Sequence, residues 1–177
     1  MTTGTPLPEI IAHRGNATEF PENTLQSLAS AIELGIKHLE FDVQLTADKV
    51  PVLLHDAELE RVASREGNVH ELTWSQLAET PVGEVKRFGH RFAFTYPPSL
   101  AQVVDAIEGW DGVTAFVEIK RASLRHFGRE TVLRRVTDLR RGLDYLEPRT
   151  DIDQTRIGVI APSAGSGLGL ILAALED

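Results

Sequence analysis

Residues 38–43 read His-Leu-Glu-Phe-Asp-Val, and this stretch decides the fold because apolar and acidic side chains alternate along it. Neighbouring side chains of a β-strand point to opposite faces of its sheet, so the three apolar residues share one face. Glu40 and Asp42 share the other face. The stretch therefore predicts a strand with one face for a hydrophobic core and one acidic face.

Strands and helices alternate on both sides of this strand. Before it, residues 9–12 form a short apolar run, and a helix is predicted from about Pro21 to Gly35, capped by Asn23 or Thr24. After it, the patterns predict an accessory strand at 50–54 in an extra hairpin-like piece, strands at 113–119 and 156–160, helices at 73–78, 99–107 and 124–143, and a last helical turn or two within 168–175. This alternation predicts the α/β class, with parallel strands and right-handed crossovers.

The amino-acid composition excludes several classes of site and partner. The chain has 177 residues, of which 42% are hydrophobic and 25% charged, as expected for one globular domain with a real core. It has no cysteine, which excludes disulfides, thiolate metal sites and a cysteine nucleophile. The net charge of −8 argues against nucleic acid or an anionic membrane as the main partner. An anionic ligand therefore needs positive charge supplied locally.

No stretch of the chain resembles a targeting or membrane-spanning segment. Residues 1–8 lack both a cationic start and an apolar run. The longest apolar tract near the end, residues 168–175, is far shorter than the ~20 residues that span a bilayer. We therefore expect a cytoplasmic protein without an integral membrane segment.

Polar residues lie where the predicted strands end. Active sites of alternating α/β folds lie beyond the carboxyl ends of the strands, so these residues are expected to meet there. Glu40, Asp42 and Glu118 form a set with oxygen ligands only, which suits Mg²⁺ or Ca²⁺ better than zinc. The alternative for Glu40 and Asp42 is a solvated strand face, the more common fate of carboxylates.

Two histidines and two cations follow the same strand ends. His13 and His55 are candidates for proton transfer near neutral pH, and Arg14 and Lys120 supply positive charge for an anion. Together with a metal ion, these groups describe a site that hydrolyses phosphate esters. The alternatives are a hydrogen-bonded loop histidine at His13 and a Lys120 side chain that merely extends from the strand end to water.

Other polar residues have structural interpretations. Asp56 is expected to orient His55 or its loop, and the sequence assigns no role to Glu22. The remaining histidines carry no supporting motif and are interpreted as surface or incidental residues: His38, His70, His90 and His126.

Several motifs, in this order along the chain, resemble the glycerophosphodiester phosphodiesterase family. They are His13-Arg14-Gly15, Pro21-Glu22-Asn23-Thr24, Glu40-Phe41-Asp42-Val43, His55-Asp56 with Arg61, Pro98-Ser99-Leu100 and Val117-Glu118-Ile119-Lys120. The resemblance covers about residues 9–120, and the combination is far more specific than any single motif.

The resemblance implies a (β/α)₈ TIM barrel that hydrolyses glycerophosphodiesters to an alcohol and glycerol 3-phosphate. It implies that Glu40, Asp42 and Glu118 bind a divalent cation, Mg²⁺ or Ca²⁺. It further implies that His13 and His55 are the acid–base pair and that Arg14 and Lys120 contact the substrate phosphate. Residues 57–97 match a small insertion after the second strand of the barrel.

The length conflicts with a full barrel, which typically takes ~250 residues. We expect residues 1–177 to form a single domain, the N-terminal half of a barrel truncated after about the fourth strand. Half a barrel leaves sheet edges open, which predicts a homo-oligomer that covers them. The alternative function is a non-catalytic half-barrel that acts as an assembly or binding partner.

Overall fold

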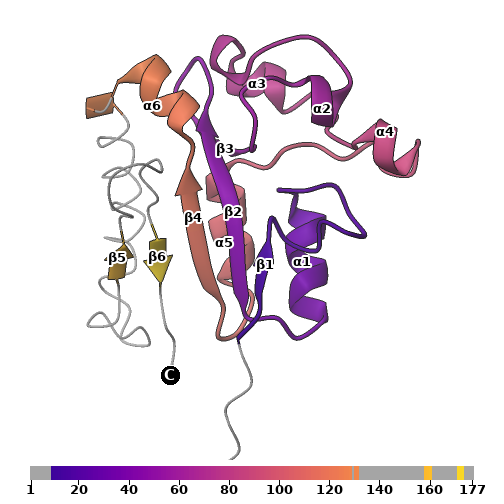
Figure 1. The fold of residues 1–177 in the computed structure, drawn as a ribbon, viewed down its shortest axis with the longest axis vertical. Helices are drawn as coiled ribbons and strands as arrows, with labels where there is room; N and C mark the ends of the chain where they lie inside the picture. Colours follow the sequence, from indigo (N-terminus) through magenta and orange to yellow (C-terminus); the bar gives the residue numbers. More distant parts are fainter. Residues whose placement is uncertain (1–8, 129, 132–157, 161–170, 174–177) are drawn as a thin grey trace, which may run out of the picture.

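A mixed sheet of four strands forms the centre of the protein, seen here in a computed structural model that describes residues 9–128, 130–131, 158–160 and 171–173. The strands are β1 (Ile11–His13), β2 (His38–Leu45), β3 (Pro51–Leu53) and β4 (Thr114–Ile119). β2 is central and runs parallel to β1 on one side and to β4 on the other (Figure 1). Its register places His13 opposite Glu40 and Asp42 opposite Glu118, so the carboxyl ends of the three parallel strands meet.

β3 is the accessory strand predicted at 50–54, and it forms a hairpin with β2 instead of joining the parallel strands. This strand runs antiparallel to the carboxyl end of β2, with Val43 opposite Leu53. The chain between the two strands is a tight turn, closed by a hydrogen bond from the Thr46 amide to the Val50 carbonyl, with Lys49 at a φ of 64°. A parallel return needs a crossover of about a dozen residues, so a turn this short permits only a hairpin.

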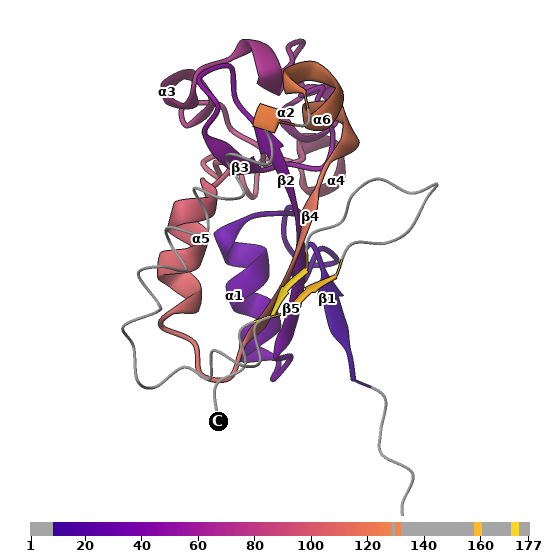
Figure 2. The same cartoon turned by 90° about the vertical axis from the view of Figure 1, so that its left-hand side faces the viewer.

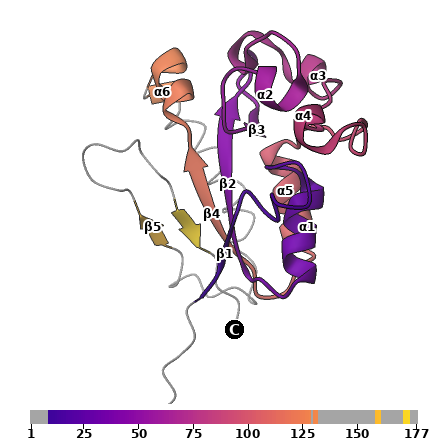
Figure 3. The same cartoon turned by 45° about the vertical axis from the view of Figure 1, so that its right-hand side comes forward.

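Two helices, α1 (Leu25–Glu33) and α5 (Leu100–Ile107), cover one face of the sheet (Figures 2 and 3). Their buried side chains pack against the apolar face of β2, as the alternation of residues 38–43 predicts; the core includes Leu28, Ala31, Leu39, Phe41, Val43, Leu100 and Val103. Thr24 caps α1, because its side chain accepts a hydrogen bond from the Ser27 amide. The opposite face of β2 is left to Glu40 and Asp42.

The chain between β3 and α5 forms a second layer beyond the carboxyl ends of the strands, at the top of Figure 1. It contains short helices: α2 (Glu60–Ala63), the 3₁₀ helix η1 (Val69–Glu71), α3 (Trp74–Leu77) and α4 (Val85–Phe88). This layer has its own apolar cluster, which includes Leu54, Leu59, Val62, Val69 and Leu77. The predicted insertion, residues 57–97, falls within this segment.

The elements after β4 differ from expectation. Helix α6 (Arg121–Phe127) begins three residues before the predicted helix at 124–143, of which residues 132–143 lie outside the described part. β5 (Gly158–Ile160) pairs antiparallel with β6 (Ile171–Ala173), so the predicted helical turn within 168–175 is wrong over residues 171–173. A short apolar run reads alike as strand or helix, and pairing with β5 decides it.

Within the described residues, no helix is long and apolar enough to cross a membrane. The cytoplasmic location stays a prediction.

Candidate active site

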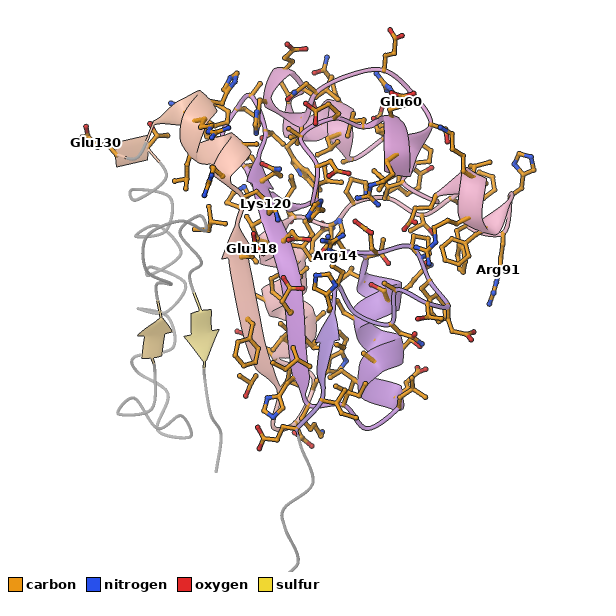
Figure 4. All side chains as sticks on the ribbon, in the orientation of Figure 1. Arg14, Glu60, Arg91, Glu118, Lys120 and Glu130 are labelled. Carbon is orange, nitrogen blue, oxygen red and sulfur yellow. The ribbon has the colours of Figure 1, made fainter. Side chains whose placement is uncertain are left out.

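Three carboxylates gather on the side of the sheet that α1 and α5 do not cover. Glu40 and Asp42 lie on β2, and Glu118 lies on β4 opposite Asp42. One oxygen from each lies within 4.8 Å of the others. The Asp42 side chain is fully buried, whereas that of Glu40 is 17% exposed and that of Glu118 is 48% exposed. The predicted metal-binding residues are thus brought together, and the exposure of Glu118, labelled in Figure 4, leaves one side of the cluster open to solvent.

The cluster is short of positive charge at Glu40. Burial, and then the neighbouring Asp42 carboxylate, raise the pKa of Glu40 to about 7, although the Arg14 amide donates a hydrogen bond to Glu40 Oε2 at 3.1 Å. A divalent cation relieves such crowding of carboxylates. The donors are oxygens only and lie close enough to share one ion, so the residues fit a hard cation such as Mg²⁺ or Ca²⁺.

Asp42 is the anchor of the cluster and is held from several directions. Asn23 Nδ2 donates to Asp42 Oδ2 at 2.9 Å, and Asn23 Oδ1 accepts from the Asp42 amide at 3.0 Å. Arg14 Nε lies 2.9 Å from Oδ2, and Lys120 Nζ lies 3.2 Å from Oδ1. Asn23 is thus not the helix cap that it was a candidate for. It adopts the left-handed conformation, with a φ of 55°, and supports a buried charge instead.

Arg14 and Lys120, the predicted phosphate contacts, lie at the carboxyl ends of β1 and β4 beside these carboxylates (Figure 4). Arg14 Nη1 also contacts the two carboxylate oxygens of Glu22, at 3.2 and 3.3 Å. Lys120 Nζ donates to Glu118 Oε1 at 2.8 Å. Both cations therefore neutralise carboxylates, and both lie beside the acidic cluster.

The two predicted histidines reach the same end of the sheet. The side chain of His13, the last residue of β1, is 67% exposed, and its Nε2 lies 3.8 Å from Glu40 Oε2. His55 follows β3, and its Nδ1 lies 2.7 Å from Asp56 Oδ1. Because a carboxylate only accepts hydrogen bonds, we infer that Nδ1 carries a proton and that Nε2 is left to exchange one. The orienting role expected of Asp56 agrees with this geometry.

Sequence reasoning missed the part played by Glu22 and Arg61. Arg61 Nη2 donates to Glu22 Oε1 at 2.7 Å, and Arg61 Nε donates to Asp56 Oδ2 at 2.5 Å. Burial alone raises the pKa of Glu22, but Arg61 and Arg14 outweigh it and the net shift is downward. The only signal in the sequence is that both residues belong to the motifs quoted above.

His70 is also misjudged by the sequence, because it is buried, at 6% exposure. Its Nε2 lies 3.1 Å from Ser123 Oγ and 3.3 Å from Gln44 Oε1. Ser123 Oγ donates to Gln44 Oε1 at 2.7 Å, and Gln44 Nε2 donates to the His55 carbonyl at 3.0 Å. This buried polar cluster ties β2, η1 and α6 to the loop that carries His55.

Comparison with known proteins points to one family. Residues 13–154 match the sequence profile of the Glycerophosphoryl diester phosphodiesterase family. The glycerophosphodiester phosphodiesterase of Caldanaerobacter subterraneus subsp. tengcongensis is 36% identical over 124 residues, which are 70% of this chain and 50% of that protein. Human glycerophosphodiester phosphodiesterase 1 is 33% identical over 94 residues, 53% of this chain and 28% of that protein.

Solved structures agree. An Oleispira antarctica phosphodiesterase, solved with the product sn-glycerol-3-phosphate, matches 64% of this chain and 45% of its own, at 34% identity and a TM-score of 0.59. A glycerophosphodiester phosphodiesterase from Agrobacterium tumefaciens matches 68% and 53%, at 28% identity and a TM-score of 0.59. These similarities confirm the predicted α/β barrel type as a partial barrel. The chain spans about half the length of these relatives, or less.

Proposed function

Because the chain belongs to the glycerophosphoryl diester phosphodiesterase family, we propose that it hydrolyses glycerophosphodiesters to an alcohol and glycerol 3-phosphate. The observation that carries the proposal is the meeting of three carboxylates, two histidines and two cations at the carboxyl ends of the strands. Arg14 and Lys120 supply positive charge for the phosphodiester, and the acidic cluster needs a cation before an anion can bind beside it. We favour hydrolysis over a non-catalytic half-barrel because the similar proteins are glycerophosphodiester phosphodiesterases.

Glu40, Asp42 and Glu118 are the proposed ligands of Mg²⁺ or Ca²⁺. Their oxygens lie within 4.8 Å of one another, and the raised pKa of Glu40 marks the place where positive charge is lacking. When bound, such an ion polarises the phosphoryl oxygens and stabilises the charge that develops on them. The protein's own part is to hold the carboxylates in place, chiefly by fixing Asp42 with Asn23 and Arg14.

His13 and His55 are the proposed acid–base pair. One histidine takes a proton from the attacking water as the water oxygen forms the new P–O bond. The other gives a proton to the alcohol oxygen as the old P–O bond breaks, so one water is consumed and the alcohol and glycerol 3-phosphate are released. The order of these roles stays open. His55 is prepared for either role, because Asp56 holds its Nδ1 and leaves Nε2 for the substrate.

Arg14 and Lys120 are the proposed phosphate contacts. In the described part of the chain, Arg14 uses its Nε and Nη1 for Asp42 and Glu22, which leaves the N–H groups of Nη2 for a substrate oxygen. Lys120 carries three N–H donors and contacts two carboxylates, which leaves one donor. Each cation can thus hold the site together and bind an anion.

The test is release of choline from glycerophosphocholine by the purified chain, with Mg²⁺, with Ca²⁺ and with a chelator. We expect activity that depends on the cation and is lost in His13→Ala and in Glu118→Gln, whereas His90→Ala, on an exposed residue far along the insertion, retains it. A folded protein without cation-dependent hydrolysis overturns the proposal. Because the chain spans about half of its relatives, sedimentation of the active sample tests whether a homo-oligomer covers the open sheet edges.

A further inference from the structure

An unbroken series of charged side chains joins the proposed metal site to His55. The charged members alternate in sign and lie within ion-pair distance, and the last of them contacts His55; in order they are Asp42, Arg14, Glu22, Arg61 and Asp56. The series crosses three segments that are far apart in sequence: the loop between β1 and α1, the strand β2, and the segment from His55 into α2. Arg61 contacts both Glu22 and Asp56, and so it joins the part of the series near the metal site to the part near His55.

The geometry at Arg61 uses properties that only arginine has. Its Nε and Nη2 point to two different carboxylates, Asp56 at 2.5 Å and Glu22 at 2.7 Å. The planar guanidinium holds these donors in a fixed fork, whereas a lysine amine is a single point of charge. The Glu22 side chain is only 9% exposed, so its ion pairs are partly shielded from water. Arg61 thus sets the distance between the two carboxylates.

Each carboxylate in turn holds a residue with a proposed role in hydrolysis. Asp56 fixes the ring of His55 through Nδ1, and Glu22 contacts Arg14 Nη1. A rigid spacing between a proton-transfer group and a phosphate-binding group matters, because a misplacement of about 1 Å can cost about 100-fold in rate. We propose that Arg61 is a positioning residue that fixes the His55 ring through Asp56 and the Arg14 side chain through Glu22. This inference rests on the proposed hydrolysis.

The two arms of Arg61 predict separable kinetic effects. Asp56→Asn removes the carboxylate that contacts His55, so the main effect is expected on kcat, a fall of about tenfold or more. Glu22→Gln removes the carboxylate that contacts Arg14, so the main effect is expected on KM, a rise. Arg61→Met combines both effects, and Arg61→Lys, which keeps the charge without the fork, restores them only in part. The control is Arg65→Met, because Arg65, within the described part of the chain, hydrogen-bonds to a backbone carbonyl and to Thr80 and has no carboxylate partner.

A readout without substrate separates this inference from the proposed function. Long-range proton–nitrogen correlation spectra of the labelled chain report which ring nitrogen of His55 is protonated. We expect a single form with the proton on Nδ1 in the unaltered chain and in Arg65→Met, and a mixture of forms in Arg61→Met. The spectra remain decisive if the chain proves inactive, and they can be read on Arg61→Lys if Arg61→Met does not fold.

Two results overturn the inference. One is an Arg61→Met protein with kcat and KM both within about twofold of the unaltered enzyme. The other is a His55 ring whose protonated nitrogen is the same with and without the Arg61 guanidinium. A double variant of Arg61 and Asp56 with no larger loss of kcat than Asp56→Asn alone supports it, because residues that act through one another are not additive.

Discussion

Replacing Glu40 by glutamine is expected to stabilise the metal-free protein at pH 8. Burial and then the Asp42 carboxylate raise the pKa of Glu40 from 4.5 to about 7. That difference corresponds to about 3 kcal/mol, at ~1.4 kcal/mol for each pH unit. The Glu40 side chain lies at an opening to solvent, which screens the charge, so we expect a gain of about 1–2 kcal/mol in Glu40→Gln.

The sign of the stability change in Glu40→Gln follows from the protons that the folded and unfolded states bind. Between about pH 4.5 and pH 7 the folded protein holds a proton on Glu40 that the unfolded chain has released. Stability therefore falls as the pH rises through this window, and the full cost of the ionised Glu40 is present above it. The gain in Glu40→Gln is thus expected to be absent near pH 4.5, to grow up to pH 7 and to be largest at pH 8.

Glu22→Gln is the matched control, because the same chemical change is expected to have the opposite sign. Arg61 and Arg14 outweigh the burial of Glu22 and lower its pKa, so the ionised form stabilises the fold at pH 8. Loss of the Glu22 carboxylate leaves Arg61 and Arg14 each with one hydrogen-bond acceptor fewer, and it is expected to cost about 1–2 kcal/mol of stability. The comparison isolates electrostatics from any general effect of a glutamine near the site.

The assay is thermal unfolding in a chelating buffer from pH 5 to pH 8, where 1 kcal/mol moves Tm by roughly 2–4 °C for a chain of this size. The chelator is then replaced by Mg²⁺ or Ca²⁺. A cation at about 100 times its Kd adds ~2.7 kcal/mol to the unaltered protein and less to Glu40→Gln. A Glu40→Gln protein that is no more stable than the unaltered one at pH 8 without metal refutes the reasoning.

Two further predictions concern the support of the site. Asn23→Ala removes both hydrogen bonds to Asp42, so we expect it to lower the free energy of unfolding by about 2–4 kcal/mol and to weaken Ca²⁺ binding in calorimetry. The control Asn16→Ala is expected to cost about 1 kcal/mol, and equal losses in the two variants contradict the role of Asn23. Gly15 has a φ of 78°, and a Cβ there meets a backbone carbon at 2.5 Å, so Gly15→Ala is expected to cost over about 2 kcal/mol in urea unfolding. Gly112→Ala, with a φ of 62° and nothing within 4 Å, is expected to cost only the conformational strain of about 1 kcal/mol, and a similar loss in both contradicts the close approach.

The sequence predicts the site best where strand periodicity decides the geometry. Glu40 and Asp42 share a face by period two alone, and parallel pairing then brings Glu118 beside Asp42. The contact between Glu22 and Arg61 has no such rule, because these residues are 39 positions apart and neither lies on a strand. Loops are positioned by tertiary contacts, which local sequence patterns do not encode.

Short strands of the fold follow the same division. The pattern of residues 50–54 identifies an accessory strand, and the short turn before it fixes its antiparallel pairing with β2. The run at 171–173 carries no periodicity long enough to separate strand from helix, and only its partner β5 does so. His70 looked incidental because a single buried histidine leaves no pattern in its neighbours.

The balance of charge at the site also indicates where the proposed cation binds. Five carboxylates belong to the connected network, namely Glu22, Glu40, Asp42, Asp56 and Glu118, and three cations face them, namely Arg14, Arg61 and Lys120. With both histidines neutral, the excess is two negative charges, which one divalent cation cancels. The arginine side chains contact Glu22, Asp42 and Asp56, and Lys120 contacts Asp42 and Glu118. Among the described residues no lysine or arginine side chain pairs with Glu40, so the excess of negative charge falls on Glu40 and Glu118. The deficit of positive charge thus lies where the proposed ion has its ligands, and supplying that ion is expected to remove the cost of Glu40 without disturbing the pairs that hold His55.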